Sequence, residues 1–101
     1  MRHPTFLAAA LALAGAAQAQ SPEALNLRSM AASCAQCHGT DGRAAPGSTV
    51  PPIAGMQRDY LVAQLKAFKA GTRPATIMNQ LAKGFSDAQL EQLAGYFAAQ
   101  K

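Results

Sequence analysis

Cysteine, histidine and strand-like patterns are all scarce in this 101-residue chain. The two cysteines, Cys34 and Cys37, are so close in sequence that a disulfide between them would close a tiny loop, and it would be a poor structural staple. No stretch alternates apolar and polar residues as a half-buried strand does, which favours an all-α domain. Basic residues are scattered singly, without interleaved aromatic side chains, and this argues against nucleic-acid binding.

The first nineteen residues have the pattern of a secretory signal peptide. A basic start at residues 1–3 precedes an apolar run from Phe6 to Ala17, which is too short to span a bilayer. Ala17-Gln18-Ala19 has the small-x-small pattern of a cleavage site, so we expect cleavage after Ala19 rather than an anchor or an ordinary alanine-rich helix. The sequence predicts a periplasmic protein with a signal peptide at residues 1–19, one domain at residues 20–101, and no stable membrane insertion.

Capping and periodicity predict about three main helices in the remaining domain. Ser21 and Pro22 open the first helix, a terminating glycine follows the second, and serine and glutamine form a capping box before the third. The segment from Thr72 to Lys83 contains Pro74 and is expected to be a structured crossing segment with room for a short helix. The predicted helices are Pro22–Ser33, Arg58–Ala70 and Asp87–Ala99.

A long irregular loop and a small core together suggest a bound cofactor. Glycine and proline interrupt all periodicity between Gly39 and Gly55, and so long an irregular segment is usually disordered or wrapped around something functional. A domain of this size buries only ~60% of its unfolded surface. Because a disulfide between its two cysteines would stabilise the domain little, we expect a large apolar cofactor to supplement the core.

Cys34-Ala35-Gln36-Cys37-His38 is the CxxCH pattern by which haem c is attached. Two thiols at this spacing, at the end of a helix, can each bind one haem vinyl group and leave His38 as the proximal iron ligand. A thioredoxin-like pair would need a βαβ unit, and zinc would need four ligands. Both readings, and that of two unrelated structural cysteines, therefore fit the sequence less well.

The second iron ligand cannot be another histidine, since His38 is the only one beyond residue 19. Met30 lies one turn before Cys34 and is expected in the core, while Met56 and Met78 follow His38 by eighteen and forty residues. Met78 has the better path to the opposite face of the ring, so we predict it as the ligand over Met56 or an open site. His38 also needs its other ring nitrogen bonded, and a backbone carbonyl of the Pro51-Pro52 segment is the expected acceptor.

Four segments of the chain resemble the bacterial single-haem class I c-type cytochromes. They are the nine residues from Cys34, Pro-Pro-Ile-Ala-Gly from Pro51, the twelve residues from Tyr60, and Gln-Leu-Ala-Gly-Tyr-Phe-Ala from Gln92. The resemblance implies a small all-α cytochrome c fold around one covalent haem, with Met78 as the axial ligand and the proline carbonyl at Pro51. It also implies a close crossing of the first and last helices at Gly95 and Tyr96.

The segment Arg-Pro-Ala-Thr-Ile-Met, ending at Met78, is similar to the haem subunit of flavocytochrome c sulfide dehydrogenase and to halves of dihaem cytochromes. Met56, where that family often has glutamine, departs from the pattern. The resemblance implies an electron carrier rather than an enzyme, either free or as the haem subunit beside a flavoprotein; a gas sensor or peroxidase would require an unbound Met78. The scattered basic residues suit docking onto acidic redox partners. Haem propionates could pair with three of them, Arg43, Arg73 and Lys83, and the alternative is that these side chains are simply solvated.

Overall fold

The computed structural model describes residues 19–101, and within that range it contains helices and no strand. Residues 1–18, which carry most of the predicted signal peptide, lie outside the described residues. Four α-helices and one 3-10 turn follow in order: α1 (Pro22–His38), η1 (Thr40–Gly42), α2 (Arg58–Ala70), α3 (Met78–Lys83) and α4 (Asp87–Ala98). None of these described helices is long and apolar enough to cross a membrane.

Helix α1 begins where predicted but extends five residues further. The Ser21 hydroxyl accepts a hydrogen bond from the Ala24 amide at 3.1 Å, and Pro22 occupies the first helical position. The predicted end at Ser33 was wrong, because no proline or glycine interrupts the chain before Gly39. At Gly39 the backbone turns to a φ of 87°, and its amide bonds to the Ala35 carbonyl at 3.0 Å. The CxxCH segment is therefore the last turn of α1.

The ends of α2 and α4 follow the predicted capping signals. Gly71 adopts the left-handed conformation, with a φ of 77°, and its amide bonds back to α2. Both hydrogen bonds of the capping box between Ser86 and Gln89 are present at the start of α4. The crossing segment also contains a short helix, α3, whose Asn79 side chain donates to the carbonyls of Phe68 and Arg73, each at 2.9 Å. These bonds hold α3 beside the end of α2.

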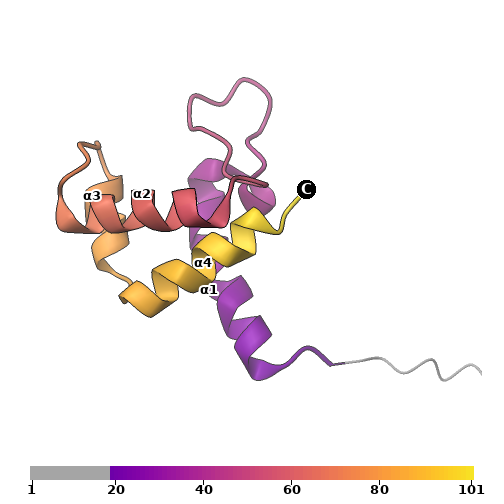
Figure 1. The fold of residues 1–101 in the computed structure, drawn as a ribbon. Coiled ribbons are helices and arrows are strands. Elements are labelled where there is room, and N and C mark those ends of the chain that lie inside the picture. The colour runs from indigo at the N-terminus through magenta and orange to yellow at the C-terminus, as the bar shows by residue number, and fades with distance from the viewer. Residues whose placement is uncertain (1–18) are drawn as a thin grey trace, which may run out of the picture.

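Helix α4 is central to the described fold, since it packs against both α1 and α2, while α2 also packs against α3 (Figure 1). A small apolar cluster joins α1, α2 and α4, and its buried members are Ala31, Leu61, Leu93, Ala94 and Phe97. The segment between η1 and α2 loops away from the helices in Figure 1 and then returns to them. The amide of Gly55 donates to the carbonyl of Phe97 at 2.9 Å, which ties the returning end of this loop to α4.

Candidate functional site

The last turn of α1 carries three of the predicted site residues. Cys34 and His38 are half-buried, and Cys37 is exposed. Residues three and four apart lie on one face of a helix, so Cys34 shares its face with both Cys37 and His38. Two thiols and one imidazole therefore project from the same side of α1 just before the chain leaves the helix at Gly39.

Both cysteines are free thiols, and burial raises the pKa of Cys34, an effect that a hydrogen bond with Ser33 partly opposes. Redox-active cysteine pairs depend on the opposite shift, because the thiolate is the reactive form. The described residues also lack the strands of a thioredoxin-like unit. Residues 19–101 contain no group of three or more His, Cys, Asp or Glu side chains placed to hold a metal ion together. The thioredoxin and zinc interpretations thus find no support in the described fold.

The His38 ring is oriented by the loop that follows η1. Its Nδ1 lies 2.6 Å from the carbonyl oxygen of Pro51. A carbonyl can only accept a hydrogen bond, so the proton of a neutral ring must be on Nδ1. The lone pair of a neutral His38 is then on Nε2, on the far side of the ring, where it can bind a metal. The structure thus brings together His38 and Pro51, two of the predicted site residues.

The three methionines beyond residue 19 have different surroundings. Met30 and Met56 are partly buried and pack against the apolar cluster, whereas Met78 is half-buried and is the first residue of α3. Its neighbours Ile77 and Leu81 expose 55% and 46% of their surface. Large exposed apolar side chains grouped in this way are typical of a surface that binds another apolar group. Met78 is therefore the methionine that lies outside the core and next to apolar surface.

This donor set fits a covalently attached haem. Two free thiols can form thioether bonds to the ring, an imidazole nitrogen and a thioether sulfur are both known iron ligands, and exposed apolar side chains beside Met78 suit the flat apolar face of a porphyrin. The predicted site residues come from three separate elements: α1, the loop at Pro51, and α3.

Two of the three basic residues considered for haem propionates have partners within the protein. The Arg43 Nε donates to the Lys101 carbonyl at 2.6 Å, and the Arg73 guanidinium lies over the Phe68 ring, 4.6 Å from its centroid. Arg73 also donates to the side-chain oxygen of Gln64. Lys83 ends α3 and is exposed. For Arg43 and Arg73, the observed contacts favour a structural role.

Gly95 and Tyr96 were expected at the crossing of the first and last helices. Helices α1 and α4 do pack together, but a Cβ atom at Gly95 would have Arg58 Nε as its nearest neighbour, 3.7 Å away, and nothing from α1 within 4 Å. Gly95 is thus not required there by a close approach of α1. Tyr96 does lie near α1, since it lines one hollow with Leu27 and the charge of Arg28 acts on it. Its hydroxyl also donates a hydrogen bond to the Asp41 carboxylate in η1, a contact that the sequence pattern did not reveal.

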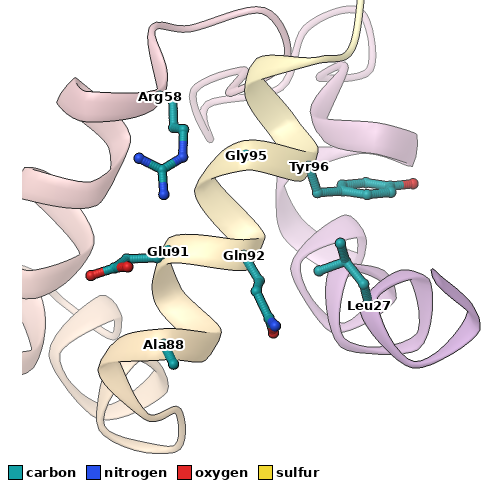
Figure 2. A pocket seen from close by; sticks show the side chains of 7 residues that line it. All are labelled: Leu27, Arg58, Ala88, Glu91, Gln92, Gly95 and Tyr96. Carbon is teal, nitrogen blue, oxygen red and sulfur yellow. The ribbon is translucent and has the colours of Figure 1, made fainter. Parts of the chain in front are cut away.

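A hollow of about 540 Å³ lies beside α4, on a side that includes Gly95 and Tyr96 (Figure 2). Its other lining residues are Leu27, Arg58, Ala88, Glu91 and Gln92. None of the five predicted site residues lines it. A haem bound through Cys34 and Cys37 would therefore lie at the end of α1 and not in this hollow.

The comparisons with known proteins agree with this chemistry. The family model for cytochrome c matches residues 23–101. Cytochrome c-554(548) of Halomonas halodenitrificans is 36% identical over 72 residues, which are 67% of this chain and 84% of that protein. The cytochrome subunit of sulfide dehydrogenase from Chlorobaculum tepidum is 42% identical over 65 residues, 64% of this chain and 57% of that protein.

A solved structure of cytochrome c4 from Acidithiobacillus ferrooxidans matches with a TM-score of 0.61 at 41% identity. The match covers 65% of this chain and 37% of that one. The chain spans between 28% and 57% of the length of three of the curated relatives that it matches.

Proposed function

Since the chain belongs to the cytochrome c family, we propose that it is an electron carrier that holds one haem c through thioether bonds to Cys34 and Cys37. When bound, this group supplies a single iron that changes by one electron between its ferrous and ferric states. His38 and Met78 would hold the iron through an imidazole nitrogen and a thioether sulfur. The chain itself makes and breaks no substrate bonds, so it is a carrier and not an enzyme.

The observation that carries this proposal is the 2.6 Å contact between His38 Nδ1 and the Pro51 carbonyl. A bond of this kind fixes the tautomer and the plane of a metal-binding imidazole and makes the other nitrogen a stronger donor. The contact therefore supports His38 as a ligand and Pro51 as the residue that orients it.

Met78 is the second ligand in this proposal because Met30 and Met56 already pack against the apolar cluster. A neutral thioether and apolar neighbours both disfavour the additional charge of ferric iron, so this ligand raises the reduction potential relative to a second histidine. The exposed side chains of Ile77 and Leu81 would cover the porphyrin near the methionine and keep water from it.

The carrier is proposed to work in the periplasm, after residues 1–19 are removed as a signal peptide, with residues 20–101 as the functional domain. The support is the basic start, the apolar run and the small-x-small site in the sequence.

A free carrier with separate donor and acceptor proteins is the favoured form. The support is that this chain covers 84% of cytochrome c-554(548), a relative of similar length. The second candidate, a haem subunit beside a flavoprotein in an oxidoreductase, is supported by 42% identity to the cytochrome subunit of a sulfide dehydrogenase.

Methionine variants of the haem-loaded protein test the ligand assignment. In Met78→Ala the reduced protein should bind carbon monoxide, while the wild type and Met56→Ala should not, because only the first variant opens an iron position. Carbon monoxide binding by Met56→Ala and not by Met78→Ala would reverse the assignment. Protein that lacks covalent haem after denaturation would overturn the proposed function as a whole.

Size-exclusion chromatography of the untagged protein from its native cells, followed by haem absorbance, separates the two forms. Haem that elutes at the mass of one small domain supports the free carrier. Haem that elutes with a larger flavin-containing species supports the subunit.

A further inference from the structure

Gly42 lies where three parts of the fold meet. It ends η1, four residues after His38, and it is buried with a φ of 79°. A Cβ atom built on it would lie 2.8 Å from Ile53 Cγ1 and 2.8 Å from Phe97 Cδ1. The turn after α1, the loop that contains Pro51, and α4 therefore touch at a position that has room only for hydrogen.

The backbone of Gly42 also holds the loop through hydrogen bonds. Its carbonyl accepts from the amides of both Ile53 and Ala54, at 2.9 and 3.1 Å. The next residue, Gly55, donates to the Phe97 carbonyl of α4 at 2.9 Å. These three bonds fix consecutive residues that begin only two positions after Pro51, whose carbonyl faces His38.

A methyl group on Gly42 would displace this loop. Besides the two side-chain contacts, it would lie 3.0 Å from the Ala54 amide nitrogen, a backbone atom that cannot move without its neighbours. The left-handed φ of Gly42 adds strain for any residue with a Cβ. The smallest movement that would remove these close contacts is an outward shift of residues 53 and 54, and the Pro51 carbonyl would move with them.

We infer that Gly42 is a positioning residue for the iron ligand His38. By holding residues 53–55, it sets the contact between the Pro51 carbonyl and His38 Nδ1. That contact in turn sets the reduction potential of the haem iron. This inference rests on the proposed function, in which His38 binds iron. A strong Nδ1 hydrogen bond makes the imidazole a better donor and stabilises the ferric state. Loosening that bond should therefore raise the potential.

Gly42→Ala and Gly47→Ala form a matched pair for the test. Gly47 lies in the same loop with a φ of 78°, but a Cβ atom there would meet nothing within 4 Å. Both variants impose a methyl group on a left-handed backbone, and both should melt at a lower temperature than the wild type. Only Gly42→Ala should show a higher reduction potential in a spectroelectrochemical titration of the haem-loaded protein. Equal potentials in all three proteins would overturn the inference.

Gly55→Ala is a milder second variant if Gly42→Ala does not accumulate. Its Cβ atom would meet one backbone atom, the Gln100 carbonyl oxygen, at 3.1 Å. We expect a smaller upward shift of the potential, and an unchanged potential would again contradict the role of this loop. If the variants keep covalent haem and the wild-type potential, only the positioning role of Gly42 is refuted. If the wild-type protein carries no haem, the proposed function as an electron carrier is refuted.

Discussion

The hydrogen bond from Tyr96 to Asp41 predicts a measurable contribution to stability. The bond joins α4 to the turn after the haem-attachment segment, and the half-buried Tyr96 ring packs edge-on against Phe97 with centroids 5.2 Å apart. Tyr96→Phe removes the hydroxyl and keeps the ring, so packing is unchanged. The variant therefore isolates the hydrogen bond.

The size of the effect follows from the charge and the exposure of the acceptor. A hydrogen bond to a charged group contributes about 1.5–3 kcal/mol in general. Because 38% of the Asp41 side chain is exposed, solvent screening reduces this to about 1 kcal/mol. A loss of 1 kcal/mol lowers the melting temperature of a domain of this size by roughly 4–8 °C.

The effect should also depend on pH in a definite direction. The bond to Asp41, followed by desolvation and the nearby charge, raises the pKa of Tyr96, and Arg28 partly opposes the shift. A group whose pKa is higher in the folded state contributes its full stability below its unfolded pKa, about 10 for tyrosine. That contribution is lost as the pH rises through the folded pKa, so the wild type should lose its advantage over Tyr96→Phe above about pH 10.

Thermal unfolding of the haem-loaded proteins, followed by circular dichroism from pH 7 to pH 11, measures both effects. Tyr60→Phe is the matched control, because the Tyr60 side chain is 47% exposed and takes part in no hydrogen bond among the described contacts. A Tyr96→Phe variant as stable as the wild type at pH 7, or a gap that persists unchanged to pH 11, would refute the reasoning.

Three further predictions concern the core, the helix caps and the surface charges. Leu93→Ala removes a side chain that is 2% exposed and should lower the free energy of unfolding by about 2–5 kcal/mol, measured by urea titration. Ser86→Ala breaks the capping box of α4 and should destabilise by about 1 kcal/mol in the same assay, while Ser86→Thr should retain most of the wild-type stability. The hydrogen bond from Lys66, at 2.8 Å, lowers the pKa of the Glu91 carboxyl in the folded protein. The stability that this ion pair contributes is therefore present above the unfolded pKa of Glu91 and is lost as the pH falls through the folded pKa. Urea midpoints of the wild type should therefore fall more steeply below about pH 4 than those of Glu91→Gln, and parallel pH curves would contradict the role of this ion pair.

The predicted class, a small all-α cytochrome c fold, is confirmed by the family match and by the similarity to a cytochrome c4 structure. Its helices were predictable where local signals set their ends: Ser21, the capping box at Ser86, and Gly71 all act within one turn of the chain. The end of α1 was predicted too early because a helix persists until a residue interrupts it, and only Gly39 does so.

Parts of the site that lie close together in sequence were predictable, and contacts between distant parts of the chain were not. The thiols and His38 lie within five consecutive residues, so their spacing was enough to predict haem attachment. The bond from Tyr96 to Asp41 and the packing of Gly42 against Phe97 join residues more than fifty positions apart. Such contacts depend on how α4 lies against the turn after α1, and no local pattern in the sequence records that arrangement.

The spacing of the site along the chain has a consequence for how the protein matures. Cys34, Cys37 and His38 are neighbours in sequence, the bond from His38 to Pro51 closes a segment of thirteen residues, and Met78 follows His38 by forty. The entropy lost on closing a loop grows with the length of that loop. Covalent attachment can therefore occur on an unfolded chain, the Pro51 loop can close next, and the methionine can arrive last. For the proposed ligand set, an immature form with haem attached but Met78 not yet bound is the state that this order predicts in a newly made chain.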